Sequence, residues 1–495
     1  MTWTFWTPVA LLGVSVVTAL VIFPLDEEQV RLRTLFNLGG ATLKLLLVGV
    51  IFWGSFRGFS FETRFAFLPE VDLLLRVDYL SLLFVTLSAI LWFLTTVFAI
   101  GYLERSPNRS RFFGFFSLCV TATMGIALAG NMVTFLVFYE MLTVVTYPLV
   151  VHRGTGAALE AGRVYLLYTL SGGILLLVGT VWLYSAVGPT EFETGGQLAA
   201  AAAADPRTLR WIFLLLVAGL GVKAALFPLH GWLPVAMVAP APVSALLHAV
   251  AVVKAGAFGI VRVVSDVYGI QTVDRLGLLT PLAVLAAFSI IYGSLRALAQ
   301  DDLKRLLAFS TVSQLAYITL GVAIMSPLAT AGGLVHLLHQ GMMKVTLFFC
   351  AGLLAETLGI HKVSEMNGVG RRMPLTMAAF TVAAFGMIGV PPVAGFVTKW
   401  YLGMGAVQAG QGWVLGVLAT SSVLNAMYFL PIVGAAWFRA AEADWGERGP
   451  AEAPLSLLVP ALATGALALA AGVLAGLPFS PLWLVRLALG EVDAS

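Results

Sequence analysis

The chain has 495 residues, of which 60% are hydrophobic and only 11% charged, and its mean hydropathy is +0.95. Soluble globular proteins carry about 25% charged residues, so this composition excludes a soluble protein and predicts an integral membrane protein. The net charge of +3 is too small to indicate a nucleic-acid partner. Both cysteines, Cys119 and Cys350, fall in apolar stretches, which argues against a disulfide framework or a metal cluster.

Fourteen apolar runs are long enough to cross about 30 Å of hydrocarbon as helices. The first lacks the charged start and cleavage site of a secretory signal, so we expect it to be retained as a span. The segment 187–208 is predicted as a surface loop, and the short apolar piece 478–489 as an interfacial segment. We therefore predict an all-α polytopic membrane protein with spans at 4–24, 36–55, 79–103, 112–129, 132–150, 163–185, 209–228, 242–264, 277–298, 306–325, 328–355, 374–402, 411–438 and 455–477.

Basic residues are distributed unevenly over the alternate connections between these spans. One set of loops carries fifteen Lys and Arg: 25–35, 104–111, 151–163, 229–241, 296–305, 357–373 and 439–454. The opposite set carries eight: 56–78, the connection around 130, 186–210, 262–275, 326–327, 403–410 and 478–495. Cytoplasmic loops are enriched in basic residues. We therefore expect the first set in the cytoplasm and both termini outside, in a multi-pass protein of the bacterial inner membrane.

Lysines, and not arginines, occupy the interior of the predicted spans. A charge at the bilayer centre costs at least ~2.5–3.5 kcal/mol, which makes an intramembrane ionisable group a functional-site hypothesis. A buried lysine can give up its proton, whereas arginine stays charged, so lysine suits a path for protons. The alternative is that the long side chains reach the membrane interface, and this alternative is strongest for Lys44. The five residues are Lys44, Lys223, Lys254, Lys344 and Lys399.

Two stretches combine a proline break with such a lysine. In residues 219–256, Pro228 separates two apolar runs, and in residues 380–402 the pair Pro391 and Pro392 interrupts another. Paired broken helices in corresponding positions are typical of inverted-repeat transporters, whose sites lie near the midplane. This pattern predicts spans 1–3 in residues 1–111, two five-helix inverted repeats in 112–264 and 276–438, and a last span with an interfacial tail in 455–495.

Glu140 is the single carboxylate well inside a predicted span. One interpretation makes it the partner of a buried lysine, most simply Lys223, because a coupled pair can respond to a moving proton. The other interpretation is a protonated glutamate that is hydrogen-bonded within the bundle.

Histidines accompany two of the lysines. His248 precedes Lys254 and His339 precedes Lys344, which suits a relay of titratable groups bridged by water. His336 shares a helical face with His339, but two histidines without a third ligand argue against a metal site. For His336 alone, a hydrogen-bonded core histidine is the simpler interpretation.

No nucleotide-binding glycine motif, P-loop or cysteine cluster occurs in the sequence, so we predict no cofactor. An ion path without its own energy source indicates an antiporter driven by gradients or one module of a larger machine. A self-sufficient solute carrier is disfavoured, because no polar pocket for an organic substrate is evident.

Six ordered motifs between about residues 75 and 440 resemble those of the antiporter-like subunits of complex I and of Mrp-type multisubunit cation/proton antiporters. They read FYEMLT, GVKAALFPLHGWLP, VAPAPVSALLHAVAVVKAG, DDLKRLLAFSTVSQLAYI, HLLHQGMMKVTLFFCAG and GVPPVAGFVTKW. The segment MVAPAPVSALLHAVAVVKAG, together with Lys399, is most similar to the D component of the Mrp antiporter.

The resemblance implies fourteen helices with two inverted repeats and a Glu–Lys pair that matches Glu140 and Lys223. It further implies a connecting lysine that matches Lys254 and a terminal lysine that matches Lys399, while His248 and His339 match positions that are usually polar. One departure is Val235, where the family commonly has aspartate, which removes an acidic group on the cytoplasmic side.

Together these observations predict a proton-translocating subunit of a multisubunit Na⁺ (or other monovalent cation)/H⁺ antiporter, which is a transport function and not an enzymatic one. Its expected partners are other membrane subunits, H⁺ and the exchanged cation, and the lipid bilayer. The alternative is a proton-pumping subunit of a redox complex such as NADH:quinone oxidoreductase or a membrane-bound hydrogenase.

Overall fold

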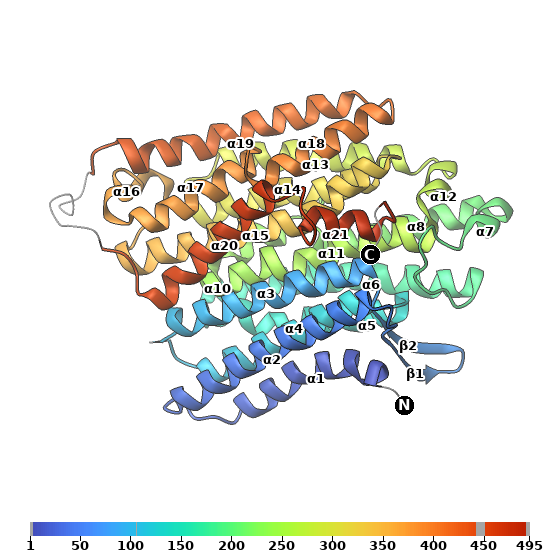
Figure 1. The fold of residues 1–495 in the computed structure, drawn as a ribbon, viewed down its shortest axis with the longest axis horizontal. Coiled ribbons are helices and arrows are strands. Elements are labelled where there is room, and N and C mark those ends of the chain that lie inside the picture. The colour runs from blue at the N-terminus through green and yellow to red at the C-terminus, as the bar shows by residue number, and fades with distance from the viewer. Residues whose placement is uncertain (1–2, 105, 442–450, 492–495) are drawn as a thin grey trace.

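A computed structural model describes residues 3–104, 106–441 and 451–491 as a bundle of helices that run along one common axis (Figure 1). Within these residues, twelve helices are long and apolar enough to cross a membrane. The other two predicted spans, 209–228 and 374–402, coincide with the helices that are interrupted. The prediction of an all-α polytopic membrane protein is confirmed.

Eleven of the twelve long helices are regular α-helices. They are α1 (Trp3–Ile22), α2 (Val30–Phe56), α3 (Tyr79–Tyr102), α4 (Arg109–Leu128), α5 (Met132–Val150), α6 (Gly156–Val187), α13 (Leu279–Leu298), α14 (Leu303–Val322), α15 (Pro327–Leu358), α19 (Trp413–Phe438) and α20 (Leu455–Val473). The twelfth, Ala241–Tyr268, alternates α10 (Ala241–Ala245), a π-helical turn (Leu246–Val250), α11 (Val252–Arg262) and a second π-helical turn (Val263–Tyr268).

The interrupted spans contain α8 (Pro206–Lys223) with the short α9 (Trp232–Val235), and α17 (Pro374–Ile388) with α18 (Ala394–Gln408). Short helices outside the spans are α7 (Ala199–Ala204), α12 (Ile270–Arg275), α16 (Val369–Arg372) and α21 (Pro481–Ala488).

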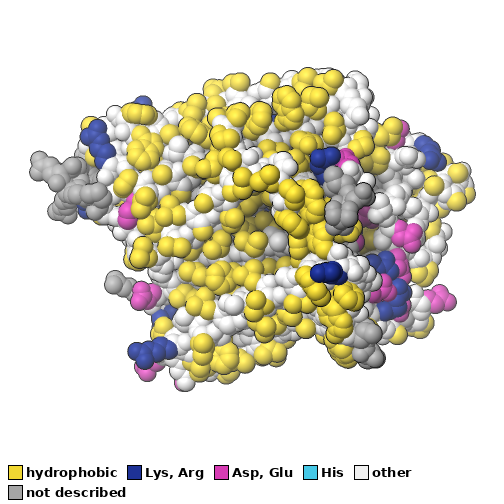
Figure 2. All heavy atoms as spheres, in the orientation of Figure 1, with side chains coloured by type: hydrophobic (Ala, Val, Ile, Leu, Met, Phe, Trp, Pro, Cys, Tyr) yellow, Lys and Arg dark blue, Asp and Glu magenta, His cyan; other side chains and the backbone are white. Residues whose placement is uncertain are grey.

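Burial separates a central layer of helices from a lipid-facing one. In the most apolar 18-residue stretch of each span, all residues of Ala241–Tyr268 and 94% of those of α14 are buried. In α2 only 33% of them are buried. Figure 2 shows hydrophobic side chains across the middle of the visible face, with acidic and basic side chains gathered toward its two ends. This distribution fits a bundle whose long axis crosses the bilayer.

Polar side chains at the helix starts supply acceptors for backbone N–H groups that have no partner within the helix. Asp78 accepts from the Ser81 N–H at the start of α3 (2.7 Å), and Asn131 accepts from the Thr134 N–H at the start of α5 (2.8 Å). Such caps define where each helix begins.

A β-hairpin replaces the simple loop predicted between the second and third spans. Strands β1 (Glu62–Leu68) and β2 (Val71–Arg76) pair antiparallel, with Glu62 opposite Arg76. The hairpin lies at the end of the bundle where the chain begins, opposite the end that carries α16 (Figure 1). The loops 56–78 and 357–373, predicted on opposite sides of the membrane, therefore lie at opposite ends of the molecule.

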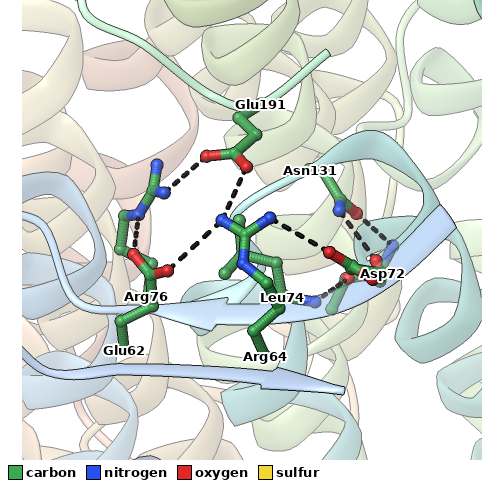
Figure 3. A network of polar contacts seen from close by, with 8 residues as sticks. Glu62, Arg64, Asp72, Leu74, Arg76, Asn131 and Glu191 are labelled. Carbon is green, nitrogen blue, oxygen red and sulfur yellow. Dashed lines mark hydrogen bonds and ion pairs between the residues drawn. The ribbon is translucent and has the colours of Figure 1, made fainter. Parts of the chain in front are cut away.

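Glu191, in the segment after α6, links this hairpin to the bundle (Figure 3). Its carboxylate accepts hydrogen bonds from Arg64, at 2.7 Å, and from Arg76. Burial by itself would raise the pKa of Glu191, but the hydrogen bonds from Arg64 and Arg76 outweigh burial and hold that pKa below its ordinary value of 4.5.

Several local predictions need correction. The segment 187–208 is not a loop throughout, because its alanine run forms α7 and α8 already begins at Pro206. Arg262, assigned to a loop, lies in the membrane-spanning segment Ala241–Tyr268, where Asp78 (2.8 Å) and Asp266 (2.6 Å) neutralise it. A buried arginine is tolerated there because both carboxylates are at ion-pair distance.

Some sequence predictions concern residues outside the described ranges. Arg105 and Arg448 are counted toward the cytoplasmic loops, but both lie outside the described ranges. The last four residues of the tail also lie outside these ranges. Within the described tail, α21 packs back on the bundle, and Trp483 stacks on Phe56 of α2 with ring centroids 5.6 Å apart.

We predict that the Glu191 cluster makes the stability of this end of the bundle depend on pH in the acid range. The pKa of Glu191 is lowered in the fold, so its carboxylate stabilises the fold above about pH 4.5, and this contribution is lost as the pH falls through the lowered pKa. The change is at most about 1 kcal/mol, because the carboxylate is 31% exposed.

Thermal unfolding of the purified protein between pH 7 and pH 3 measures this effect. E191Q should remove part of the acid-range loss, whereas E28Q, at an exposed glutamate outside the cluster, should not. An unchanged pH profile in E191Q contradicts the prediction.

Candidate functional site

The first helix break ends α8 at Lys223, and helical structure resumes at Trp232. Pro228 lies in the intervening segment. The backbone groups that the break frees find new partners, since Trp232 Nε1 donates to the Val222 carbonyl (2.8 Å) and the Phe227 N–H donates to Ser289 Oγ (3.0 Å). A non-helical segment can persist at membrane depth only when it is satisfied in this way.

Lys223 is completely buried and is held by α5. Its Nζ donates to the Tyr139 carbonyl and lies 3.4 Å from the centroid of the Tyr139 ring. The Tyr139 hydroxyl donates in turn to the Gly219 carbonyl of α8 (3.1 Å). A backbone dipole and an aromatic face can support an ammonium group without binding it as tightly as a carboxylate would.

Glu140 follows Tyr139 directly, but its carboxylate does not pair with Lys223 in the structure. No ion pair within 4.0 Å joins the two described side chains, and Glu140 Oε1 has no hydrogen-bond partner. The carboxylate packs against Gly173 of α6, where an added Cβ would lie 2.1 Å from Oε1. We call the titratable residues of the predicted relay, from Glu140 to Lys399, the polar chain. Glu140 is partly exposed, so this end of the polar chain reaches the lateral surface of the protein.

His248 and Lys254 lie on either side of a change in helix type. His248 is in the π-helical turn Leu246–Val250, with its ring 4.7 Å from that of Phe348 and no hydrogen bond to either ring nitrogen. Lys254, on α11, donates to the Leu337 carbonyl of α15 (2.6 Å). A π-helical turn offsets the residues on either side of it, which often occurs at functional sites.

Gly256 allows this span to lie directly against the first break. A Cβ at Gly256 would be 2.2 Å from the Ala224 backbone nitrogen. Lys254 and Lys223 are thereby carried on two segments in backbone contact.

Lys344, on α15, is buried and turned toward α14. Its Nζ donates to the Leu307 carbonyl (3.1 Å) and to Ser310 Oγ. Its partners are therefore a carbonyl and a hydroxyl of α14.

The second break separates α17 from α18 at residues 389–393, which include Pro391 and Pro392. Lys399, one turn into α18, donates to the Ile388 carbonyl at the end of α17 and to Ser422 Oγ of α19, both at 2.6 Å. The lysine thus satisfies a carbonyl that the break has freed. Lys399 is partly exposed, so the other end of the polar chain also reaches a lateral surface.

His336 and His339 converge on a residue that sequence reasoning did not select. Their Nδ1 atoms lie 3.2 and 3.1 Å from the hydroxyl of Thr398, the neighbour of Lys399 on α18. Nothing in the local sequence marks Thr398, because its role depends on how α18 packs on α15.

Lys44 does not reach the membrane interface, so that alternative for Lys44 is wrong. Its side chain is fully buried, donates to Ser15 Oγ of α1 and lies 4.9 Å from the centroid of the Trp92 ring of α3. Lys44 therefore belongs to the group of N-terminal helices, apart from the two breaks.

Comparison with known protein families matches residues 129–425 to the family described as "NADH:quinone oxidoreductase/Mrp antiporter, TM". Residues 69–113 match "NADH-Ubiquinone oxidoreductase (complex I), chain 5 N-terminus". The chain belongs to the NADH:quinone oxidoreductase/Mrp antiporter transmembrane family. It is an antiporter-like membrane protein of the kind found in multisubunit complexes.

Two relatives and one solved structure illustrate the range of this family. The chain is 35% identical over 414 residues to NADH-quinone oxidoreductase subunit N of Desulforudis audaxviator, covering 80% of this chain and 81% of the relative. It is 34% identical over 340 residues to a probable K⁺/H⁺ antiporter subunit (type A/B) of Rhizobium meliloti, covering 68% of this chain and 33% of that longer protein.

The solved structure is a chain of the Mrp complex from Dietzia sp. DQ12-45-1b. It superposes with a TM-score of 0.86 at 23% identity and covers 100% of this chain and 98% of that one, which shows a shared fold. These comparisons do not separate the D component of the Mrp antiporter from the other antiporter-like subunits.

We predict that G173A lowers ion transport by displacing Glu140. The added Cβ would lie 2.1 Å from Oε1, so the carboxylate has to move. G49A on α2 is the matched control, because nothing lies within 4 Å of a Cβ there. Proton transport in membrane vesicles measures both variants, and equal rates in G173A and G49A would show that the Glu140 position does not matter.

Proposed function

We propose that the chain is the proton-translocating subunit of a multisubunit monovalent cation/proton antiporter, with Na⁺ as the leading candidate for the exchanged ion. One observation carries the proposal: among the described residues, none of the intramembrane lysines has a carboxylate within ion-pair distance. Lys223, Lys254, Lys344 and Lys399 all donate to carbonyl or hydroxyl oxygens.

The nature of these acceptors favours a protonic role over a structural one. A buried lysine that only holds helices together needs an anionic partner, because an unpaired buried charge costs several kcal/mol. The structure supplies such partners for Arg262, through Asp78 and Asp266, but not for the lysines. A carbonyl or hydroxyl oxygen can accept a hydrogen bond from the charged ammonium and also from the neutral amine, so the lysine keeps its partner when the proton leaves.

The proposed path runs across the bundle from one lateral surface to the other. Protons taken up near the first break charge Lys254 or Lys223 and pass along the midplane to Lys399. Glu140 and Lys399 are both partly exposed, so each end is placed to communicate with a neighbouring membrane protein. Each elementary charge moved across 100 mV is worth ~2.3 kcal/mol, which is the energy that coupled groups along the path must control.

The antiporter assignment is supported by the likeness to the probable K⁺/H⁺ antiporter of Rhizobium meliloti and by the motif that resembles the Mrp D component, together with Lys399. A second candidate function is a proton-pumping subunit of a redox complex. The 35% identity to a NADH-quinone oxidoreductase subunit N favours it. The intramembrane chemistry is the same in both.

We expect K223A to abolish cation/proton exchange while the complex still assembles. Removing a group that carries the proton costs at least roughly 100-fold in rate, the lower end of the range for positioned acid–base groups. Dye-monitored proton exchange in inside-out vesicles measures the rate. K362A, at an exposed lysine of a loop, controls for the loss of a positive charge. Unchanged exchange in K223A would refute the proposed path.

Purification of the native complex distinguishes the two candidate functions. We expect membrane subunits without iron–sulfur or flavin absorbance, and vesicles whose proton movement needs a cation gradient. Flavin and iron–sulfur spectra, with proton movement driven by an electron donor, would favour the redox complex instead.

A further inference from the structure

One hydroxyl lies between two histidines at the junction of α15 and α18. Thr398 Oγ1 is 3.2 Å from His336 Nδ1 and 3.1 Å from His339 Nδ1, and all three side chains are buried. Both contacts are within hydrogen-bond distance. The packing that creates this junction is close, since a Cβ on Gly332 of α15 would be 3.2 Å from the Thr398 carbonyl.

The hydroxyl of Thr398 is used differently from other buried threonines of the bundle. Thr123, on α4, donates to the Cys119 carbonyl four residues earlier (2.8 Å), and Thr180, on α6, donates to the Leu176 carbonyl (2.8 Å). That bond occupies the hydroxyl proton within the residue's own helix. The hydrogen bonds of Thr398 among the described residues run to the two histidines instead, so its proton is available to them.

The number of protons at this junction limits which tautomers of the two histidines allow a proton to pass. A hydroxyl donates one hydrogen bond and accepts up to two, and a neutral imidazole carries one N–H. A proton can pass through Thr398 only if its hydroxyl donates to one Nδ1 and accepts from the Nδ1–H of the other histidine. Such a transfer requires the two neutral histidines to be opposite tautomers.

We propose that Thr398 transfers protons between His339 and His336, an inference that rests on the proposed proton path and adds two members to it. When His339 is protonated, its Nδ1–H bond breaks as a new O–H bond forms on Thr398. The original O–H bond of Thr398 breaks as an Nδ1–H bond forms on His336. One proton moves from ring to ring, and the hydroxyl is left as it began.

The surroundings extend this step in both directions. Lys254 donates to the carbonyl of Leu337, which lies between the two histidines in the chain (2.6 Å). The ring of His336 lies 5.2 Å from that of Tyr317, and Lys399 Nζ lies 5.7 Å from the centroid of the same Tyr317 ring. The histidine–threonine junction thus stands between Lys254 and Lys399.

Two substitutions at Thr398 separate the hydroxyl from the shape of the side chain. T398V keeps the branched shape without the hydroxyl and should lower the exchange rate by roughly 100-fold, as expected for loss of a positioned proton-transfer group. T398S keeps the hydroxyl and should restore exchange to within about tenfold of the unmodified complex. T123V controls for the loss of a buried helical hydroxyl outside the path and should leave exchange unchanged.

The outcomes distinguish this inference from the proposed function. Loss of exchange in K223A and T398V, with rescue in T398S, supports the role of Thr398. Loss in K223A with normal exchange in T398V, or equal loss in T398V and T398S, overturns that role and leaves the proposed function standing. Normal exchange in K223A overturns the proposed function itself.

A spectroscopic measurement tests the junction without any substitution, which covers the case in which T398V does not assemble. ¹⁵N NMR of the complex with labelled histidine reports the tautomer of each ring, and H336A and H339A assign the two signals among the six histidines of the chain. Opposite tautomers for neutral His336 and His339 support the inference. The same tautomer on both overturns it, because the transfer needs one ring that donates its Nδ1–H to Thr398 and one ring whose bare Nδ1 accepts from it.

Discussion

The structure depends on one constraint, which is that an ammonium group buried in hydrocarbon must be given acceptors. Hydrocarbon offers no hydrogen-bond acceptor, and an unsatisfied charge costs more than most single interactions in a fold contribute. The bundle meets this requirement with carbonyl and hydroxyl oxygens. Lys223 uses the Tyr139 carbonyl, Lys344 uses a carbonyl and Ser310, and Lys399 uses a carbonyl and Ser422. These acceptors serve the charged and the neutral lysine alike.

The helix breaks follow from the same constraint. In an intact helix the carbonyls accept hydrogen bonds from N–H groups of the same helix, whereas a break leaves some carbonyls free. Lys399 binds such a carbonyl at the end of α17, and Trp232 and Asn425 bind others. Each break is therefore a backbone feature that the neighbouring side chains stabilise, and the titratable group that the break accommodates is part of that stabilisation. In both proposed repeats the break falls in the fourth span of five.

Close approach between helices brings the parts together. Gly256 lets α11 touch the first break, Gly173 makes room for the Glu140 carboxylate, and Gly332 lets α15 approach the Thr398 backbone. In a bilayer, where lipid is as apolar as the side chains, small residues at such contacts favour helix association through close packing. The same glycines determine which polar atoms meet.

Hydropathy and proline placement were sufficient to predict the spans, the two breaks and the five intramembrane lysines, because each depends on the local transfer of side chains from water to lipid. Local sequence could not supply the β-hairpin with its Glu191 anchor, the contact of Lys223 with the Tyr139 carbonyl in place of the Glu140 carboxylate, or the meeting of two histidines on Thr398. Those contacts depend on the rotation and depth of each helix against its neighbours. Rotation and depth are set by packing between residues that lie far apart in the chain, so only the tertiary structure decided them.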